Sequence, residues 1–338
     1  MDNDVNVALL EAAITTARQL GLDIEVAQLE PQLGRGRADA LIRVRHGRQD
    51  ILYTAEVRRG LRRATLGAAL YQLGRLGEPA LLVTDYVTPP LADELRARGV
   101  AFLDAAGNAY LDRPSLLVWV KGQRPAEWHA ARRGTLRAFQ ASGLRVMFAL
   151  LCQPEGVDRP YREIAKLAGV AHGTVGWVMA DLLKLRFVAE VGGKRRLLRP
   201  EQLLQQWVEA YLRTLRPKLV LGSYRADTLD WWNALDPLKY GLLLGGEVAA
   251  ARLTQHLRPG TLTLYGAKPE PRFLLDHRLR PNPTGEVEIL ERFWFFDTDE
   301  PALTPMPLVY ADLLGIGDAR CLETAKLVYD RILLRFGR

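Results

Sequence analysis

Residues 161–185, YREIAKLAGVAHGTVGWVMADLLKL, decide how the centre of this chain folds. Four apolar residues in the second half of this stretch fall at i, i+3, i+4 and i+7, the spacing of one buried helix stripe: Val175, Val178, Met179 and Leu182. Small and polar residues occupy the other faces of the same helix, near its N-terminus. The stretch therefore predicts two consecutive helices, and the second buries one side while it offers the other to a partner.

The flanking residues extend this pattern to a winged helix-turn-helix over residues 142–200. GLRVMFALLC at 143–152 predicts a short apolar helix ahead of the other two, and FVAEVGGKRRLLRP at 187–200 has strand character. Within that segment, Gly192 and Gly193 permit the tight turn of a hairpin. In a helix-turn-helix the recognition helix enters the DNA major groove, so these residues predict a recognition helix followed by a wing.

Two groups of candidate DNA contacts follow from this arrangement. From the third helix we expect His172, Thr174 and Trp177 near base edges or sugars, with Gly173 among the small residues beside them. We expect four cations on phosphates: Arg162 of the second helix, and Lys194, Arg195 and Arg196 of the wing. Phosphate contacts position a protein on DNA, whereas contacts with base edges carry the sequence preference.

Positive charge is concentrated in the same part of the chain. The whole sequence has 46 Lys and Arg against 39 Asp and Glu, a net charge of +7. Residues 131–200 hold thirteen cations and five anions, a net charge of +8, so the remainder is nearly neutral. A focused basic patch of this kind is the electrostatic footprint of a polyanion-binding site.

Length and composition bound the other possibilities. A chain of 338 residues is expected to form two or three domains. Its two cysteines, Cys152 and Cys321, lie in apolar helical patterns and imply no disulfide framework. The first residues lack the pattern of a signal peptide, and no apolar run reaches the about 18 residues of a membrane span. We expect a cytoplasmic protein without a membrane partner.

The chain as a whole reads as an α+β multidomain protein. Residues 1–125 predict an α/β domain, 126–141 a basic connector, 142–200 the winged helix, and 201–338 a C-terminal α/β domain. No internal repeat and no low-complexity tract interrupts these segments.

Within the C-terminal domain, helices and strands follow one another. Residues 201–218, which begin EQLLQQWVEAYLRTLR, predict a helix that Pro217 closes, and GLLLGGEVAAARLTQHL at 241–257 predicts a helix around a glycine pair. TLTLYG and EVEILERFWFF predict strands. The residues after Pro305 predict a long helical segment with one break at 315–317.

The N-terminal domain contains an acidic pattern that resembles the D…ExK motif of restriction-endonuclease-like folds. Asp39 lies on one predicted strand, ADALIRVR, and Glu56 and Arg58 lie on one face at the end of the next. Acidic residues on adjacent strands can hold a divalent metal. Arg58 departs from the motif's lysine, and a guanidinium holds its proton too firmly to act as a base. We therefore expect a nuclease-like domain without activity, with no catalytic residue. In the alternative, a metal-dependent DNA nuclease targeted by the winged helix, Asp39, Glu56 and Arg58 would form the site.

Other enzyme and cofactor signatures are absent from the sequence. The five histidines are scattered, and no CxxC, HxxxH, phosphate-binding P-loop or GxSxG serine motif occurs. We expect no cofactor and no metal.

Four passages carry a resemblance to a known family: FLDAAGNAY at 102–110, LLVWVKGQRP at 116–125, GGEVAA at 245–250 and LVYADLLGIGDARCLETAKLVYDRIL at 308–333. Together they resemble the AbiEi-type antitoxin and transcriptional regulator family of type IV toxin–antitoxin systems, in its long branch with a nuclease-like N-terminal domain. None of these passages is a catalytic signature.

The resemblance implies a repressor of its own operon, encoded beside a nucleotidyltransferase-type toxin with which it need not form a stable complex. Separately, His172 to Val175 resemble the start of the recognition helix in GntR-like winged helices, which place an arginine where this chain has His172. A neutral histidine offers one donor and one acceptor instead of a bidentate fork, so its base preference differs.

Three functions are consistent with these observations. The first is a sequence-specific DNA-binding antitoxin and autorepressor, not an enzyme, whose partners are operator double-stranded DNA, a nucleotidyltransferase-type toxin and a second copy of the chain. The second is the metal-dependent nuclease described above. The third is a non-enzymatic scaffold that binds a protein toxin through its C-terminal domain.

Overall fold

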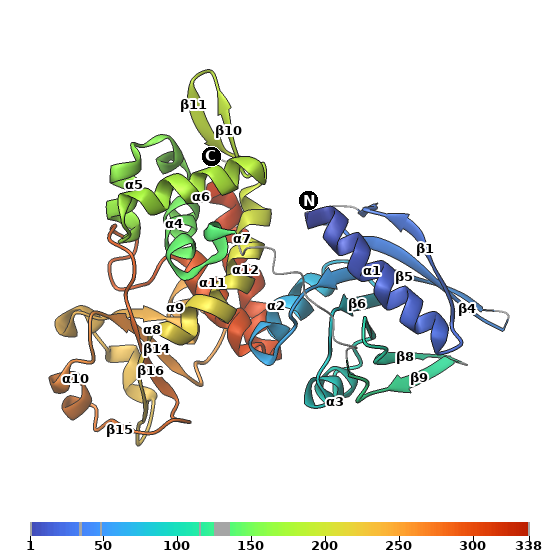
Figure 1. Ribbon diagram of the computed structural model, residues 1–338. Coiled ribbons are helices and arrows are strands. Elements are labelled where there is room, and N and C mark those ends of the chain that lie inside the picture. Colours follow the sequence, from blue (N-terminus) through green and yellow to red (C-terminus); the bar gives the residue numbers. More distant parts are fainter. Residues whose placement is uncertain (1, 34–35, 48, 115, 125–135, 337–338) are drawn as a thin grey trace. The chain divides into compact units, whose positions relative to one another are not determined.

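The computed structural model describes residues 2–33, 36–47, 49–114, 116–124 and 136–336. The chain forms two compact units, Met1–Arg132 and Arg133–Arg338 (Figure 1). Both units combine helices with a sheet, so the predicted α+β class is confirmed.

The predicted connector at 126–141 lies largely outside the described residues. Of this segment the structure describes 136–141, which contain the short 3-10 helix η1 (Arg137–Phe139) and the first residue of a longer helix.

The first unit is built on a seven-stranded sheet with the order β1-β4-β5-β6-β7-β8-β9. Its elements in chain order are α1 (Asp2–Gln19), β1 (Asp23–Leu29), β2 (Gln32–Leu33), β3 (Gly36–Arg37), β4 (Ala40–His46), β5 (Gln49–Arg58), α2 (Arg63–Leu73), β6 (Ala80–Thr84), α3 (Pro89–Ala97), β7 (Phe102–Asp104), β8 (Ala109–Arg113) and β9 (Leu116–Val120). Strands β1, β4 and β5 pair antiparallel, whereas β5, β6 and β7 pair parallel.

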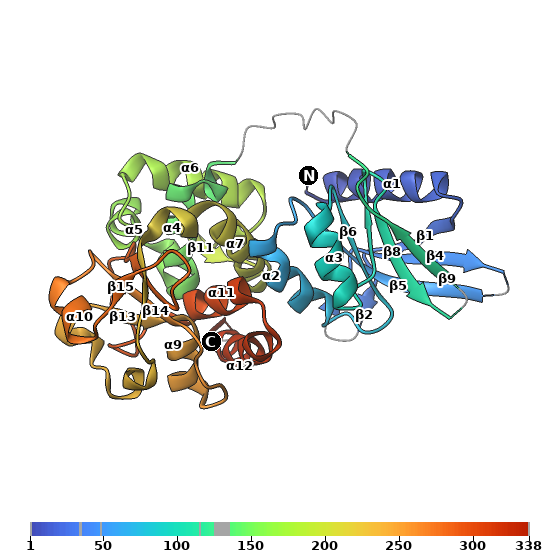
Figure 2. The same ribbon diagram turned by 90° about the horizontal axis from the view of Figure 1, so that it is seen from below.

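Helices cover both faces of this sheet, as can be followed in Figure 2. On β4, Ala40, Ile42 and Val44 are buried at every second position and pack with residues of α1. The opposite face packs with residues of α2 and α3. The central strand β6 is buried along its whole length, as expected for a strand covered on both sides.

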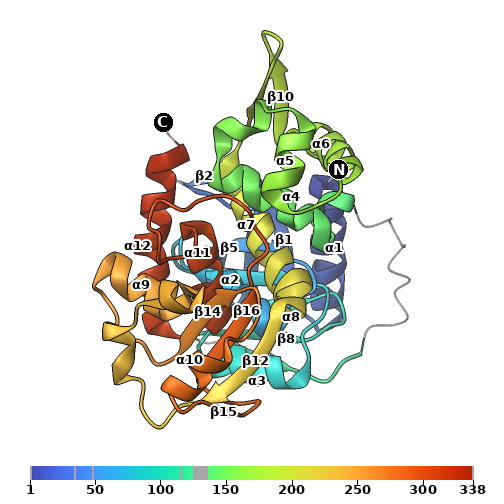
Figure 3. The same cartoon turned by 90° about the vertical axis from the view of Figure 1, so that its left-hand side faces the viewer.

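The second unit begins with a compact helical group and a hairpin. These elements are α4 (Ala141–Cys152), the 3-10 helix η2 (Pro154–Asp158), α5 (Tyr161–Ala168), α6 (His172–Lys184), β10 (Val188–Val191) and β11 (Lys194–Leu197). The residues of α6 that are buried are the four of the predicted apolar stripe, so that prediction is confirmed. The β10–β11 hairpin projects from the helices in Figure 3.

The next helical run corrects one prediction. It consists of α7 (Pro200–Ala210), a π-helical turn η3 (Tyr211–Leu215) and α8 (Arg216–Leu219), so Pro217 does not close the helix. The helix continues through the π turn into α8, and Pro217 falls at the start of α8. In the π turn the N–H of Arg216 donates to the carbonyl of Tyr211, so the proline follows a point where the regular α-helical hydrogen-bond pattern is already interrupted.

A five-stranded sheet with the order β13-β14-β16-β12-β15 forms the rest of the unit. The remaining elements are β12 (Val220–Arg225), η4 (Asp230–Ala234), η5 (Pro237–Tyr240), β13 (Leu243–Gly245), α9 (Gly246–Thr254), β14 (Leu262–Gly266), α10 (Pro271–Asp276), β15 (Arg280–Pro281), β16 (Val287–Glu291), α11 (Met306–Ile316) and α12 (Ala319–Phe336). No helix of the described ranges is long and apolar enough to cross a membrane.

The helix predicted over 241–257 was wrong in its first part. Leu243–Gly245 form a strand antiparallel to β14, and the helix begins only at Gly246. Gly246 has a φ of +51°, and a Cβ there would lie 2.7 Å from Oγ1 of Thr263. The glycine pair therefore marks a strand-to-helix junction that a larger side chain would disrupt.

The helical group and the C-terminal sheet share one core. The Phe148 ring of α4 lies 5.1 Å from that of Trp207 and 4.9 Å from that of Phe293. Trp207 Nε1 also donates a hydrogen bond of 2.9 Å to the carbonyl of Leu144. Residues 142–200 and 201–338, predicted as separate domains, thus belong to one compact unit. The boundary at 200 stays a prediction.

Candidate nucleic-acid interface

The exposed face of α6 lies opposite its buried stripe. Gly173, Trp177, Ala180 and Lys184 are exposed along this face, and 57% of Trp177 is accessible. His172 is exposed at one margin, whereas Thr174 is half-buried. Of the predicted base contacts, Gly173 and Trp177 thus lie on the most exposed line of the helix, and Ala180 and Lys184 are additions that the sequence argument missed.

The hairpin divides its three consecutive cations between two faces. Gly192 and Gly193 form a two-residue turn, with φ of +59° and +73°, between Val191 and its partner Lys194. Because side chains alternate along a strand, Lys194 and Arg196 point to one side and are exposed. Arg195 points to the other side and is half-buried.

Arg195 docks the hairpin on the helical group. Its Nη2 donates to the carbonyls of Asp158, at 3.2 Å, and Arg159, at 2.8 Å. Its backbone N–H donates to Oδ1 of Asp158 at 2.9 Å. The guanidinium also lies 4.6 Å from the ring centroid of Tyr161. The position of the hairpin is thus set by Arg195, whose side-chain N–H groups bond backbone carbonyls of the protein itself.

Tyr161 connects the docked hairpin with the N-terminal half of α6. Its ring centroid is 6.4 Å from that of His172, and a Cβ on Gly176 would lie 4.0 Å from its Cε2. In the sequence, Tyr161 is noticeable only as an aromatic residue that follows Pro160. Its role in joining the hairpin to α6 is revealed by its contacts with Arg195 and His172.

The cations of this region fall into two classes. Arg145 pairs with Glu291 at 3.7 Å, and Arg199 donates to the carbonyls of Leu185 and Arg186 just after α6. Among the residues that the structure describes, several exposed cations have no carboxylate partner: Arg137, Arg159, Arg162, Lys166, Lys184, Arg186, Lys194 and Arg196. The uncompensated positive charge is therefore on α5, α6, the hairpin and the segments beside them.

The acidic residues of the first unit serve the fold around them. Oδ2 of Asp39 accepts a hydrogen bond of 2.7 Å from the N–H of Val57. Glu56 is buried and forms an ion pair with Arg58, which confirms that these two side chains share a face. A shallow pocket lies beside Asp39, lined also by Leu10 and by Val57 of the neighbouring strand.

The D-x-A-G-N segment of the first unit is a hydrogen-bonded turn. Buried Asp104 accepts bonds from the N–H groups of Val87, Ala106 and Asn108 and from the side-chain amide of Asn108. Asn108 in turn exchanges hydrogen bonds with the backbone of Gln123. Burial raises the pKa of Asp104 even against these donors. The motif is therefore explained by backbone satisfaction.

A buried polar network lies in the C-terminal part of the second unit. The Tyr265 hydroxyl is 2.9 Å from that of Tyr211 and 2.9 Å from Oδ2 of Asp312. Arg216 bonds Asp312 at 3.2 Å and Glu288 at 2.6 Å. Burial raises the pKa of Asp312, while neighbouring Arg216 lowers it. The network joins η3, α8, β14, β16 and α11.

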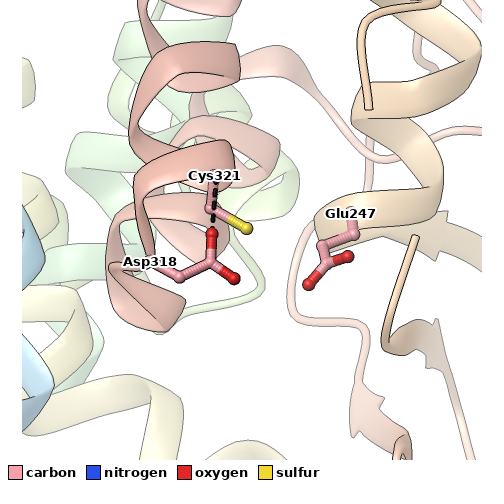
Figure 4. Close-up of side chains that lie close together, drawn as sticks. All are labelled: Glu247, Asp318 and Cys321. Atoms are coloured by element: carbon pink, nitrogen blue, oxygen red, sulfur yellow. Dashed lines mark hydrogen bonds between the residues drawn. The ribbon is translucent and has the colours of Figure 1, made fainter. Parts of the chain in front are cut away.

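Glu247, Asp318 and Cys321 form one group with the spacing of metal ligands among the described residues (Figure 4). One ligand atom of each lies within 4.8 Å of the others. Glu247 accepts from the N–H of Gly260, and Oδ1 of Asp318 accepts from that of Cys321 at 2.7 Å. Burial, with Glu247 and Asp318 beside it, raises the pKa of the Cys321 thiol. The hydrogen bond from the N–H of Cys321 to Asp318, with Glu247 and Cys321 both buried, makes this group an anchor for the start of α12.

Comparison with known proteins places the second part of the chain. Residues 196–334 match the family described as transcriptional regulator, AbiEi antitoxin, type IV TA system. No curated protein and no solved structure gives a significant match. The matched residues include the buried network of Asp312 and the Glu247 group, whereas α4, α5 and α6 precede them. Residues 196–334 are therefore similar to the AbiEi antitoxin family of transcriptional regulators of type IV toxin–antitoxin systems.

Proposed function

We propose that α4, α5, α6 and the β10–β11 hairpin are a winged helix that binds double-stranded DNA with sequence preference. One observation carries this proposal: the exposed face of α6 lies beside a hairpin whose Lys194 and Arg196 have no carboxylate partner among the described residues. Unpaired cations release counterions from DNA when they meet phosphates, and this release drives association.

The contacts divide between the two parts of the winged helix. Gly173 and Trp177, with His172 and Thr174 at the margins, face the bases in this proposal, because the residues of an exposed recognition-helix face meet base edges. Lys194, Arg196 and Arg162 meet phosphates. Arg195, which its sequence position predicts to meet a phosphate, instead positions the hairpin through Asp158 and Tyr161.

The family supports a regulatory role for this binding. A transcriptional regulator that is also an antitoxin acts, in our proposal, as the autorepressor of its toxin–antitoxin operon. Its protein partner is then a nucleotidyltransferase-type toxin encoded beside it. A homodimer would match the two-fold symmetry of a palindromic operator. The family match supports the proposed roles of antitoxin and autorepressor. The exposed face of α6 and the hairpin cations support the proposed DNA contacts.

The first unit is, in this proposal, restriction-endonuclease-like in fold and without nuclease activity. The order α1-β1-β4-β5-α2-β6, with Asp39 before β4 and Glu56 on β5, supports that fold. Arg58 cannot accept a proton from an attacking water, and its guanidinium neutralises Glu56. These residues therefore argue against the nuclease function.

A reporter assay tests the proposed function. The 300 or so base pairs upstream of the chain's own reading frame would drive a fluorescent reporter in cells that express the full chain. We expect repression by the wild type and its loss in the Lys194→Ala/Arg196→Ala variant, because two phosphate contacts are removed. Lys239→Ala, which removes an exposed cation stacked on Tyr240, is the matched control and should repress normally. Equal reporter output with and without the wild-type chain would refute autorepression.

A further inference from the structure

Arg137 is a cation beside α6 that lies outside the helices and hairpin of the winged helix. It is the first residue of η1 and is exposed, and its guanidinium carbon lies 4.1 Å from the ring centroid of Trp177. Trp177 in turn lies on the exposed face of α6. An arginine is thus stacked on the aromatic residue that the proposed function places against DNA.

The position of Arg137 is set by the backbone that carries it. Oδ2 of Asp181 on α6 accepts a hydrogen bond of 3.0 Å from the N–H of Ala138. Ala138 is fully buried, and a Cβ on Gly143 would lie 2.1 Å from the carbonyl oxygen of Arg137. Because only glycine permits this approach, η1 is held against both α4 and α6.

Stacking leaves the hydrogen-bond donors of Arg137 available. A guanidinium that lies over a ring uses its face, while its N–H groups point outward in its own plane. Within the described part of the chain no carboxylate pairs with Arg137. Arg195 also stacks on an aromatic ring, but its guanidinium donates hydrogen bonds to the carbonyls of Asp158 and Arg159. Arg137 is therefore held in position by its stacking on Trp177, and among the described residues it has no carboxylate partner.

Arg137 and the hairpin approach α6 from different sides. The hairpin is docked through Tyr161, which lies by His172 and Gly176, whereas η1 contacts Trp177 and Asp181. With 3.6 residues per turn, the midpoints of these two pairs are about 140° apart around the helix. A helix in the major groove has a phosphate backbone on each side, so cations on two sides match the two walls of the groove.

From this geometry we propose that Arg137 binds a DNA phosphate on the side of α6 opposite the hairpin, and that Trp177 holds it in place for that contact. The proposal rests on the proposed DNA-binding function. It adds a phosphate contact from the segment before α4, and it gives Trp177 a second role as the support of a cation.

The test is a salt titration of binding to a labelled 30-base-pair duplex of mixed sequence, with the full chain and its variants. Each phosphate contact contributes roughly 0.9 to the slope of log K against log salt. Arg137→Ala should lower the slope by about that amount. Between 50 and 200 mM salt, the affinity of this variant should therefore fall by a factor about 3.5-fold smaller than the factor for the wild type. Arg137→Lys should keep the wild-type slope because it keeps the charge. Lys239→Ala is the matched control and should also keep it.

The outcomes separate this inference from the proposed function. An unchanged slope in Arg137→Ala, together with a reduced slope in Lys194→Ala/Arg196→Ala, would overturn the inference and leave the winged helix intact. Failure of the wild type to bind the duplex would overturn both. A purely structural role for Arg137 would lower the thermal midpoint of Arg137→Ala without changing the slope, and that result also contradicts the proposal.

Discussion

The hairpin offers the sharpest test, because three consecutive cations have different surroundings. Lys194 and Arg196 are exposed without a carboxylate partner among the described residues, whereas Arg195 is bonded to Asp158 and Arg159 and stacked on Tyr161. Replacement of Lys194 and Arg196 by alanine should therefore remove phosphate contacts. Replacement of Arg195 should instead release the hairpin from the helical group.

The double variant should change the salt dependence of DNA binding, whereas Arg195→Ala should change the affinity itself. Loss of two phosphate contacts should lower the slope of log K against log salt by about 1.8, so the variant should lose about 12-fold less affinity than the wild type between 50 and 200 mM salt. Arg195→Ala removes two side-chain hydrogen bonds and one cation–π contact. We expect a loss of up to about 2 kcal/mol, roughly 30-fold in affinity at every salt concentration, with little change in slope.

Fluorescence anisotropy with a labelled mixed-sequence duplex at several salt concentrations measures both quantities. Lys239→Ala controls for a change in net charge elsewhere on the second unit. The reasoning is refuted if Arg195→Ala lowers the slope as much as loss of one of its neighbours. An unchanged slope in the double variant would remove the hairpin from the interface altogether.

Three further predictions concern the rest of the molecule. Asp312→Ala should lower the free energy of unfolding by about 3–5 kcal/mol in urea titrations, because the half-buried guanidinium of Arg216 loses one of its two carboxylate partners and the buried Tyr265 hydroxyl loses its acceptor; a loss below about 1 kcal/mol would contradict this. Cys321 should resist iodoacetamide at pH 7.5 in the native chain and react only on unfolding, as peptide mass mapping can measure, because burial and nearby carboxylates raise its pKa. The full chain should cleave neither linear nor plasmid DNA with magnesium or manganese, and Glu56→Ala should leave duplex binding unchanged; metal-dependent nicking that disappears in both Asp39→Ala and Glu56→Ala would establish the nuclease instead.

Periodic apolar patterns explain which parts of the fold could be predicted. The stripe from Val175 to Leu182 was predicted correctly because one helix face contacts one continuous core. Glycines carried a less certain signal: the pair at Gly245 and Gly246 was interpreted as lying within a helix, whereas it forms a strand-to-helix junction. Strands β1 and β12 escaped prediction, since most of their residues are exposed or half-buried and do not alternate clearly.

The candidate site was predictable in composition but not in detail. Sequence identified the basic hairpin, and strand alternation alone would have separated Arg195 from Lys194 and Arg196. In contrast, Tyr161 and Arg137 acquire their roles from contacts across the fold, with Arg195 and Trp177 respectively. Such contacts depend on how elements distant in the sequence pack, which local patterns do not specify.

The central claim is that α6 reads a DNA sequence while the hairpin binds the phosphates beside it. Its most direct test is the ratio of the affinities of the full chain for the upstream region of its own reading frame and for a mixed-sequence duplex, measured by competition at 150 mM or so of salt. Specific binders show ratios on the order of 10³ or more, and each base contact contributes about 1–3 kcal/mol. We predict such a ratio for the wild type and a fall of roughly 5-fold to 160-fold in each of Trp177→Ala and Thr174→Ala. Equal affinity for the two duplexes, or a ratio that both variants preserve, would contradict the account.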